Sequence, residues 1–331
     1  MKDIMALCDK DEEYVYRLQE LLSQRESFPF TVSGYSDREA FRQELKKGRF
    51  SLVLASEGFY RDVCELDEDR RPPLLLLKEK NGIPEASAYI RKYQSGEKIR
   101  QEIMEKYAPQ TGSAFGGKGD KKTVLYGVFS PVGRSIQSSV SLLMGEMMAK
   151  KGSVLYLNFE PFSGLAGLLS GSGDRDLTDL VYYMQGGKER LVYKLESMVG
   201  NVNGLDYISP AFSFVDLGQV REESWLMLIE TLKELGTYDN VILDLSEMVH
   251  GLLNVLRQCD YIYTISDREG MALSRMEQYE ELLKSLDYKD VLERSLKCEL
   301  PRFKKLPASI EELPYSELAV YVRKLLEEEG R

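Results

Sequence analysis

The chain has 331 residues, of which 43% are hydrophobic and 30% charged, a composition typical of a globular protein with about two domains. Its 54 acidic and 44 basic residues give a formal net charge of −10, which argues against a general nucleic-acid-binding surface and against adhesion to anionic lipid. Four scattered cysteines indicate a reducing compartment without structural zinc, and a single histidine, His250, excludes His-rich metal sites and Ser-His or Cys-His catalysis.

Residues 1–108 are predicted to form the first domain. Short apolar runs at 4–8, 30–32, 51–55 and 74–77 read as strands, and amphipathic stretches at 14–22, 37–47 and 97–107 read as helices. About five strands with intervening helices in this length predict a small doubly wound α/β domain with the flavodoxin-like strand order.

A connector is predicted at 109–122, PQTGSAFGGKGDKK, because four glycines and mostly polar side chains give this segment little to bury. The second domain, 123–331, begins with a strand at 123–129 and a helix at 137–150. Further strands are expected at 154–159, 206–208, 240–243, 261–265 and 295–299. Helical patterns between most of them predict a mostly parallel sheet covered on both faces.

The segment between the strand at 123–129 and the following helix reads SPVGRSIQSS over 130–139. A strand-to-helix turn of this kind aims backbone N–H groups at phosphate oxygens when it follows the pattern GxxxxGK[ST]. Here the first glycine is absent, Ile136 replaces the second, and Gln137 replaces the lysine. Ser138 remains where a Mg²⁺-holding hydroxyl would lie. The alternative is a serine-rich turn in which Ser135 caps the helix.

The order of this loop and the segments VLYLNFEPFSGL, TYDNVILDLSEM and CDYIYTISDREGM resembles the MinD/ParA (deviant Walker A) P-loop ATPases, most closely their TadZ/CpaE branch. The resemblance covers roughly 122–301. It implies a MinD-like P-loop domain with a parallel sheet, and a nucleotide site formed by Gly133, Arg134, Ser135, Ile136, Gln137, Ser138, Ser139, Glu160 and Asp267.

The resemblance also shows what the site lacks. The family's signature lysine, which reaches across a dimer, aligns with Val132, and the family's aspartates after the next strand align with Asn158 and Glu160. Asp244 keeps the Walker B position, where it could hold Mg²⁺ with Ser138 if nucleotide binds; the alternative is a buried, hydrogen-bonded aspartate. Arg134 could return one positive charge or point to solvent. We therefore expect weak ATP/Mg binding at most, and no catalytic residues.

The first domain resembles an atypical receiver domain. The two acidic residues that hold Mg²⁺ in receivers correspond to Asp9 and Lys10, the phosphate-accepting aspartate to Ser56, and the receiver lysine to Lys92. Without an acceptor carboxylate, phospho-aspartate chemistry has no nucleophile. The domain is therefore expected to serve in interactions.

The sequence supports two functional hypotheses. The first is a pseudo-ATPase that serves as a localisation or assembly scaffold for Tad/Flp pilus (secretion) machinery. The second is an ATP-binding, slowly hydrolysing switch that controls positioning or dimerisation. The resemblance implies a homodimer and partners at the inner face of the membrane. A charged N-terminus and the lack of an apolar run of ~20 residues predict a cytoplasmic protein without a membrane span, which reaches the membrane or cell pole through partners. The charge speaks against a third reading, a DNA-binding ParA-like protein.

Overall fold

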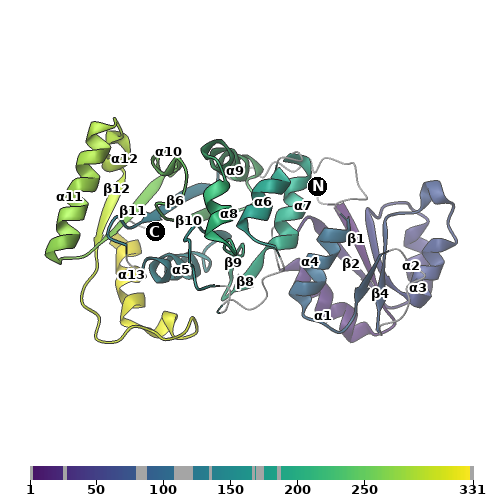
Figure 1. Ribbon diagram of the computed structural model, residues 1–331. Coiled ribbons are helices and arrows are strands. Elements are labelled where there is room, and N and C mark those ends of the chain that lie inside the picture. The colour runs from purple at the N-terminus through teal and green to yellow at the C-terminus, as the bar shows by residue number, and fades with distance from the viewer. Residues whose placement is uncertain are drawn as a thin grey trace. The chain divides into compact units, whose positions relative to one another are not determined.

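The computed structural model describes residues 3–24, 28–79, 88–107, 122–133, 136–165, 168, 175–184 and 188–328, without the side chains of 188–190 and 192. The chain divides into two compact units (Figure 1). Unit 1 comprises Met1–Gly117 and Glu189–Ser197, and unit 2 comprises Lys118–Lys188 and Met198–Arg331. Of the predicted connector, 109–122, all but the last residue lies outside the described ranges.

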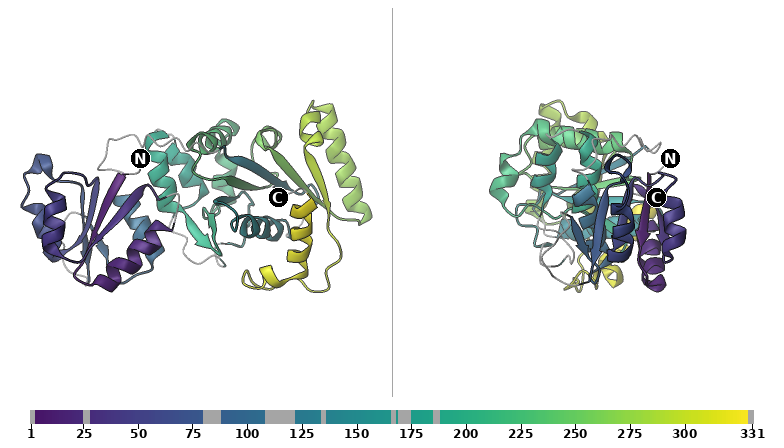
Figure 2. Two further views of the ribbon diagram at one scale, coloured as in Figure 1. Left: turned by 180° about the vertical axis from the view of Figure 1, so that it is seen from behind. Right: turned by 90° about the vertical axis from the view of Figure 1, so that its right-hand side faces the viewer.

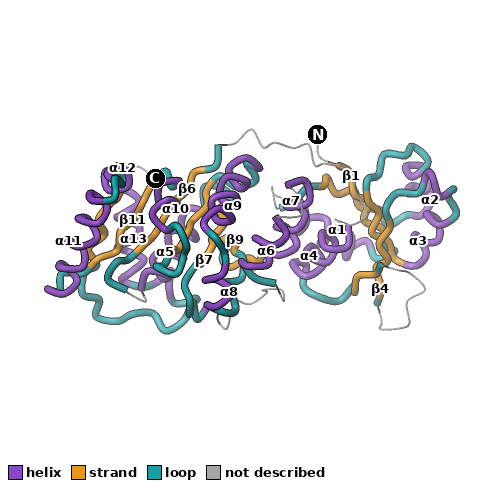
Figure 3. Tube along the Cα trace, turned by 45° about the horizontal axis from the view of Figure 1, so that its top comes forward, coloured by secondary structure: helices purple, strands orange, loops and turns teal. Residues whose placement is uncertain are grey.

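Figure 3 shows the strands of unit 1 in orange, with helices on both sides of them. They form a five-stranded parallel sheet in the order β2-β1-β3-β4-β5. This confirms the flavodoxin-like order predicted from the sequence. Its elements are β1 (Asp3–Cys8), α1 (Glu12–Ser23), β2 (Phe30–Tyr35), α2 (Arg38–Leu45), β3 (Leu52–Ser56), α3 (Glu57–Cys64), a short 3₁₀ helix (Glu68–Arg70), β4 (Leu74–Lys78), β5 (Tyr89–Arg91), α4 (Gly96–Tyr107) and α7 (Lys188–Met198).

Alternating side chains of the strands in unit 1 separate two apolar layers. Met5 and Leu7 of β1 pack in the layer that α1 and α4 cover, whereas Ala6 and Cys8 pack in the layer of α2 and α3. The two helix pairs lie on opposite faces of the sheet in Figures 1 and 2. Because successive strand residues point to opposite faces, fully apolar strands are what a sheet covered on both sides requires.

Helix α7 follows two strands of unit 2 in the sequence but packs in unit 1. Tyr193 is buried in the α1/α4 layer, with its ring centroid 5.5 Å from that of Tyr107. The Arg100 guanidinium of α4 donates hydrogen bonds to the Glu196 carboxylate (2.8 Å) and to its backbone carbonyl (2.7 Å). Both side chains are fully buried. An ion pair without water requires good geometry, because each charge has lost its hydration, so this pair fixes α7 against α4.

A buried ion pair lies where the sequence resembles a receiver site. Lys92 Nζ is 3.1 Å from Asp9 Oδ1, with both side chains buried, and 4.7 Å from the centroid of the Tyr14 ring. Lys10 and Ser56 line a neighbouring cavity of about 420 Å³. The buried lysine thus has a carboxylate partner within the unit itself.

Unit 2 contains a seven-stranded sheet in the order β12-β11-β6-β10-β7-β9-β8, parallel except for β8. The mostly parallel sheet is confirmed, but the β8–β9 hairpin is absent from the sequence interpretation. Its turn is Asn203-Gly204, both with positive φ (50° and 87°), which is the dipeptide that two-residue hairpins favour. The strands are β6 (Val124–Phe129), β7 (Val154–Asn158), β8 (Gly200–Val202), β9 (Leu205–Tyr207), β10 (Asn240–Leu245), β11 (Tyr261–Ser266) and β12 (Ser295–Glu299).

Helices cover both faces of this sheet (Figures 1 and 2). They are α5 (Ile136–Met148), α6 (Leu177–Met184), α8 (Phe214–Gln219), α9 (Glu222–Leu235), α10 (Leu252–Gln258), α11 (Gly270–Ser285), α12 (Lys289–Glu293), a 3₁₀ helix (Leu313–Tyr315) and α13 (Glu317–Glu328). Side chains of α5 and α13 share one apolar layer with the sheet, so the C-terminal helix packs against its own unit. In the described ranges, no helix combines the length and apolar character needed to cross a bilayer.

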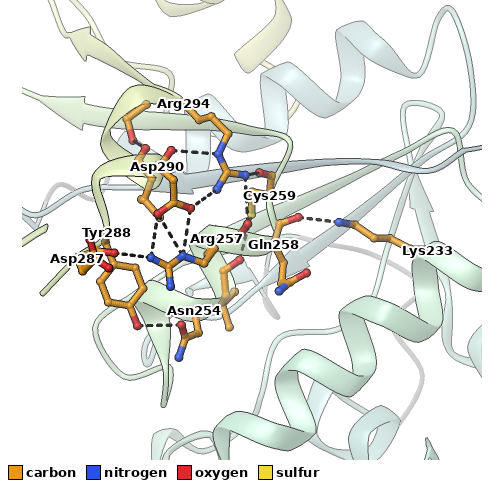
Figure 4. A network of polar contacts seen from close by, with 12 residues as sticks. Lys233, Asn254, Arg257, Gln258, Cys259, Asp287, Tyr288, Asp290 and Arg294 are labelled. Carbon is orange, nitrogen blue, oxygen red and sulfur yellow. Dashed lines mark hydrogen bonds and ion pairs between the residues drawn. The ribbon is translucent and has the colours of Figure 1, made fainter.

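Side-chain donors terminate α10 in unit 2 (Figure 4). Lys233 Nζ donates to the carbonyl of Gln258 (2.7 Å), and Arg294 Nη1 donates to that of Cys259 (2.6 Å). Asp290 of α12 accepts hydrogen bonds from both Arg257 and Arg294, and the bonds from Arg257 lower the pKa of this carboxyl. Since the last carbonyls of a helix have no partner within it, these contacts fix the turn that leads into β11.

We expect Glu196→Ala to lower the free energy of unfolding by about 3–5 kcal/mol, since it removes the fully buried carboxylate of the pair and leaves the Arg100 guanidinium with the partly exposed Glu97. Urea denaturation followed by circular dichroism measures the loss. Glu97→Ala is the matched control, because Glu97 contacts the same guanidinium at 3.2 Å from a partly exposed position and should cost about 1 kcal/mol or less. Equal losses of unfolding free energy in the two variants would contradict the conclusion that the Arg100–Glu196 pair is the main interaction holding α7 against α4.

Candidate functional site

The loop at the phosphate-binding position runs from Ser130 to Gly133 between β6 and α5. Gly133 has a φ of +67°, a conformation that glycine adopts without strain, and its N–H donates to the carbonyl of Ser130 (3.3 Å). The Ser130 hydroxyl in turn donates to the carbonyl of Ile265 in β11 (2.9 Å). Two of the predicted site residues, Arg134 and Ser135, lie outside the described residues.

Val132, at the position of the signature lysine, packs within its own chain. It forms a small buried cluster with Ala272 and Met276 of α11, and its carbonyl accepts a hydrogen bond from Arg275 Nη1 (3.0 Å). The side chain that would reach another molecule in the resembled family is here an apolar anchor that holds the loop on α11.

Gln137, at the position of the phosphate-loop lysine, points into the sheet. Its side chain is buried, and Nε2 donates to Asp244 Oδ1 (2.6 Å) and to the carbonyl of Leu245 (2.9 Å). The amide also lies 3.4 Å from Glu160 Oε1. Gln137 therefore bridges α5 to the end of β10 with a neutral group.

Asp244 has no exposed surface. Its second oxygen, Oδ2, accepts from Tyr156 Oη (2.7 Å) and from Asn158 Nδ2 (2.7 Å). Asn158 is the register neighbour of Asp244 on β7, and Tyr156 is two residues earlier on the same face. We call these four residues, Gln137, Tyr156, Asn158 and Asp244, the Asp244 cluster. Burial raises the pKa of Asp244, while hydrogen bonds from Ser138, Gln137 and Tyr156 oppose that rise.

Ser138 and Glu160 contact this cluster, and both are half-buried, as is Ser139. The Ser138 hydroxyl accepts from Asn158 Nδ2 (3.3 Å) and is hydrogen-bonded to Asp244, so these two predicted residues lie together. The N–H of Glu160 donates to Asn158 Oδ1 (3.0 Å). Burial, together with the charges of Asp244 and Glu247, raises the pKa of Glu160 to about 7. This side of the loop is thus acidic, and its Gln137 contributes no charge.

Ile136 and Asp267 lie together in a different place. They line an open cavity of about 1110 Å³, together with Glu299, Phe303 and Tyr321. Gln137, Ser138, Glu160 and Asp244 are not among its lining residues. Among the described side chains, no group of three or more His, Cys, Asp or Glu residues is placed to hold a metal ion. The predicted site residues therefore fall into two groups. Gln137, Ser138 and Glu160 lie around Asp244, whereas Ile136 and Asp267 line the cavity, and the two groups are adjacent at the first turn of α5, where Ile136 precedes Gln137.

Tyr156 is the cluster residue that the sequence interpretation missed. The signal available was its spacing: Tyr156 and Asn158 alternate along a strand, so they share one face. The register between β7 and β10, which places both side chains beside Asp244, could not be predicted from the sequence.

No family model matches the chain, and no curated protein is similar enough to count as a match. Solved structures similar to it include a ParA family ATPase from Chlorobium tepidum TLS, with 18% identity, a TM-score of 0.44, and coverage of 62% of this chain and 93% of that one. A putative plasmid partition protein from Borrelia burgdorferi B31 bound to AMPPNP has 13% identity, a TM-score of 0.43, and coverage of 63% and 100%. Apo McdA from Cyanothece has 16% identity, a TM-score of 0.42, and coverage of 62% and 81%. Since these scores lie below 0.5, the description of the fold rests on the sheet order and that of the site on its own contacts.

We expect Asp244→Ala to cost about 3–5 kcal/mol of unfolding free energy, because it removes the buried acceptor that the Tyr156 hydroxyl and the amides of Gln137 and Asn158 share. Urea denaturation followed by the fluorescence of Trp225, which is buried in unit 2, reports the loss. Glu247→Ala, at an exposed position three residues further, should stay within about 0.5 kcal/mol. A loss below about 1 kcal/mol for Asp244→Ala would refute a structural role for this carboxylate.

Glu160→Gln should remove a pH dependence of stability. The pKa of Glu160 is raised from 4.5 to about 7 in the folded chain, so ionisation disfavours folding, and the penalty grows as pH rises from about 4.5 to 7 and then levels off. The variant is expected to be more stable than the wild type at pH 8, with the difference shrinking towards pH 5. Urea midpoints at the two pH values measure this, with Glu281→Gln on the exposed side of α11 as control. An unchanged difference between pH 5 and 8 would contradict the raised pKa.

Proposed function

We propose that this protein is a non-catalytic or weakly active member of the TadZ/CpaE-like branch, with an ATPase fold that serves as a scaffold. The observation that carries the proposal is the 2.6 Å hydrogen bond between Gln137 Nε2 and Asp244 Oδ1. It joins the residue at the lysine position to the residue at the Walker B position.

The chemistry of this bond opposes phosphoryl transfer. Such transfer relies on cations, a lysine and Mg²⁺, that neutralise charge developing on the phosphate oxygens. A neutral amide supplies no such charge. The hydrogen bond that a lysine would make to a phosphate is charge-assisted, and such a bond contributes about 1.5–3 kcal/mol to binding. Asn158, where the resembled family has an aspartate, donates to Asp244 and offers no carboxylate base.

Mg²⁺ does not fit Asp244 in this arrangement. Both carboxylate oxygens accept hydrogen bonds from protein side chains, and the residue has no exposed surface, whereas Mg²⁺ keeps several water molecules when it binds carboxylates. Ser138 and Asp244 could hold the ion only after Gln137 moved away. The magnesium site therefore stays a prediction that depends on nucleotide.

As a scaffold, the chain would act through its surfaces. The resemblance of its segments suggests Tad/Flp pilus or secretion components as partners, a homodimer as the acting form, and attachment to the membrane or cell pole through those partners. The flavodoxin-like sheet of unit 1, with Ser56 at the position of the receiver's acceptor, suits an atypical receiver domain used for interaction. The net charge of −10 speaks against DNA as a partner.

The second candidate is an ATP-dependent switch. The observation that favours it is that the loop keeps the positive φ of Gly133 and the half-buried hydroxyl of Ser138 beside Asp244, which are groups that a phosphate and its ion could contact. In this case nucleotide binding would displace the Gln137 amide and gate dimerisation.

Phosphate release in millimolar ATP and Mg²⁺ separates these functions. The scaffold is expected to release phosphate no faster than the Asp244→Asn variant. Turnover that this substitution abolishes would overturn the proposal. Calorimetry at millimolar ATP adds the second distinction: saturable binding that weakens in Ser138→Ala, without turnover, would favour the switch.

A further inference from the structure

Large apolar side chains are exposed on three connections between elements of unit 2, the second of which includes the start of α8. Phe162 follows β7, Phe212 and Phe214 follow β9, and Met248 follows β10. Phe162 is 83% and Phe212 95% exposed, and Phe214, Val215 and Met248 are exposed as well. We call these five residues the apolar face. Clusters of exposed aromatic side chains are uncommon on protein surfaces that contact only water.

Contacts bring Phe162, Phe214 and Met248 of this face together at α8, and Phe212 and Val215 are chain neighbours of Phe214 or its cap. The rings of Phe162 and Phe214 lie 5.5 Å apart. Met248 reaches α8 one turn beyond Phe214, where its Cε lies 3.3 Å from the place that a Cβ on Gly218 would take. Loops from two different strands therefore meet on helix α8.

The backbone beneath the apolar face is held in place. The N–H of Phe212 donates to Asp176 Oδ2 (2.8 Å), and Ser213 caps α8 by accepting from the N–H of Val215 (3.1 Å). His250 Nε2 donates to the carbonyl of Gly218 (2.7 Å). Since ordering a loop upon binding costs free energy, a surface that is already held favours association.

The apolar face lies at the same edge of the sheet as the Asp244 cluster. Strands β10, β7 and β9 are parallel neighbours, so the loops that follow them leave from one edge (Figure 1). Glu160, beside the cluster, is two residues before Phe162.

The segments that carry the apolar face contain acidic side chains, and the basic side chains Arg175 and Arg221 lie beyond them in the sequence. The three segments, 159–165, 209–220 and 246–251, contain Glu160, Asp216 and Glu247 but no lysine or arginine. Asp216 also lines an adjoining cavity of about 600 Å³ formed by α6, α8 and the start of α9, where Glu223 adds a carboxylate and Arg221 a cation. The exposed Tyr182 is part of this cavity.

These observations define the chemistry of an occupant. Apolar side chains must fill the aromatic surface, and cations must meet the carboxylates around it, because complementary charge selects partners at an interface. A second copy would bring the same carboxylates, and an anionic bilayer would be repelled by them. An amphipathic helix with lysine or arginine beside its apolar stripe meets both requirements.

We propose that the apolar face is a docking site for a partner protein, which inserts an amphipathic cationic helix between Phe162, Phe212 and Met248. The acidic residues Glu160, Asp216 and Glu247 flank that helix. The interaction does not depend on whether the phosphate loop binds nucleotide.

Fluorescence anisotropy tests the proposal with the full chain. The probe is a labelled synthetic peptide with leucine at helical spacing and lysine at the other positions. Phe162→Ser/Phe212→Ser is expected to weaken its binding at least about tenfold, since exposed aromatic anchors carry most of the energy of such interfaces. Tyr315→Ser/Leu306→Ser is the matched control, because both of its residues are exposed apolar side chains outside the apolar face, and it should bind like the wild type.

Charge provides the second part of the test. Asp216→Lys/Glu247→Lys is expected to weaken the lysine peptide severalfold at low salt, with the difference shrinking as salt is added. A peptide with glutamate in place of lysine should not bind.

Three results would overturn the proposal. The first is equal affinity of the wild type and Phe162→Ser/Phe212→Ser for the lysine peptide. The second is a wild-type dimer in sedimentation that this double variant abolishes, which would assign the apolar face to a second copy. The third is retention on phosphatidylserine vesicles that the same variant abolishes, which would assign it to a membrane.

Discussion

A carboxylate with no exposed surface stands at the centre of the second sheet. Removing a charge from water is costly unless protein groups replace its hydration, and Asp244 receives that replacement from donors on two other elements, α5 and β7. This need for hydrogen-bond donors constrains both partners. The donors hold the carboxylate, and the carboxylate fixes the helix that follows the phosphate loop to the two central strands.

This constraint determines which kind of group α5 presents to the carboxylate. Donors to one carboxylate must be neutral or cationic, and here the donor from α5 is the amide of Gln137. The amide satisfies the aspartate but leaves no charge for a phosphate. The Val132 side chain likewise contacts its own chain, since it is buried against α11 instead of extending outward. The side chains of Gln137 and Val132 thus stabilise the chain itself, and in the proposal above recognition rests on the exposed aromatic side chains that follow the same strands.

The layering of the fold could be predicted from the sequence, because apolar runs such as 51–55 and 240–243 are recognisable without knowledge of their neighbours. The pairing of Asp244 with Gln137 was not, since it depends on the direction of one side chain at the start of a helix. Tyr156 was missed because its hydroxyl meets the carboxylate only through the register of β7 and β10. The Asn203-Gly204 turn was a local signal that could have been used. Contacts distant in sequence, such as that between Arg100 and Glu196, leave no local pattern at all.

The place of α7 in the chain has a consequence for how the protein is made. Domains tend to fold in order as the chain leaves the ribosome, the N-terminal one first. The strands of unit 1 and its helix α4 are complete long before α7 is synthesised, and β6 and β7 emerge in between. Until then the Arg100 guanidinium lacks its buried carboxylate and Tyr107 lacks the ring of Tyr193. One apolar layer of the nascent N-terminal sheet is therefore incompletely packed until a segment from the second half of the chain has been synthesised.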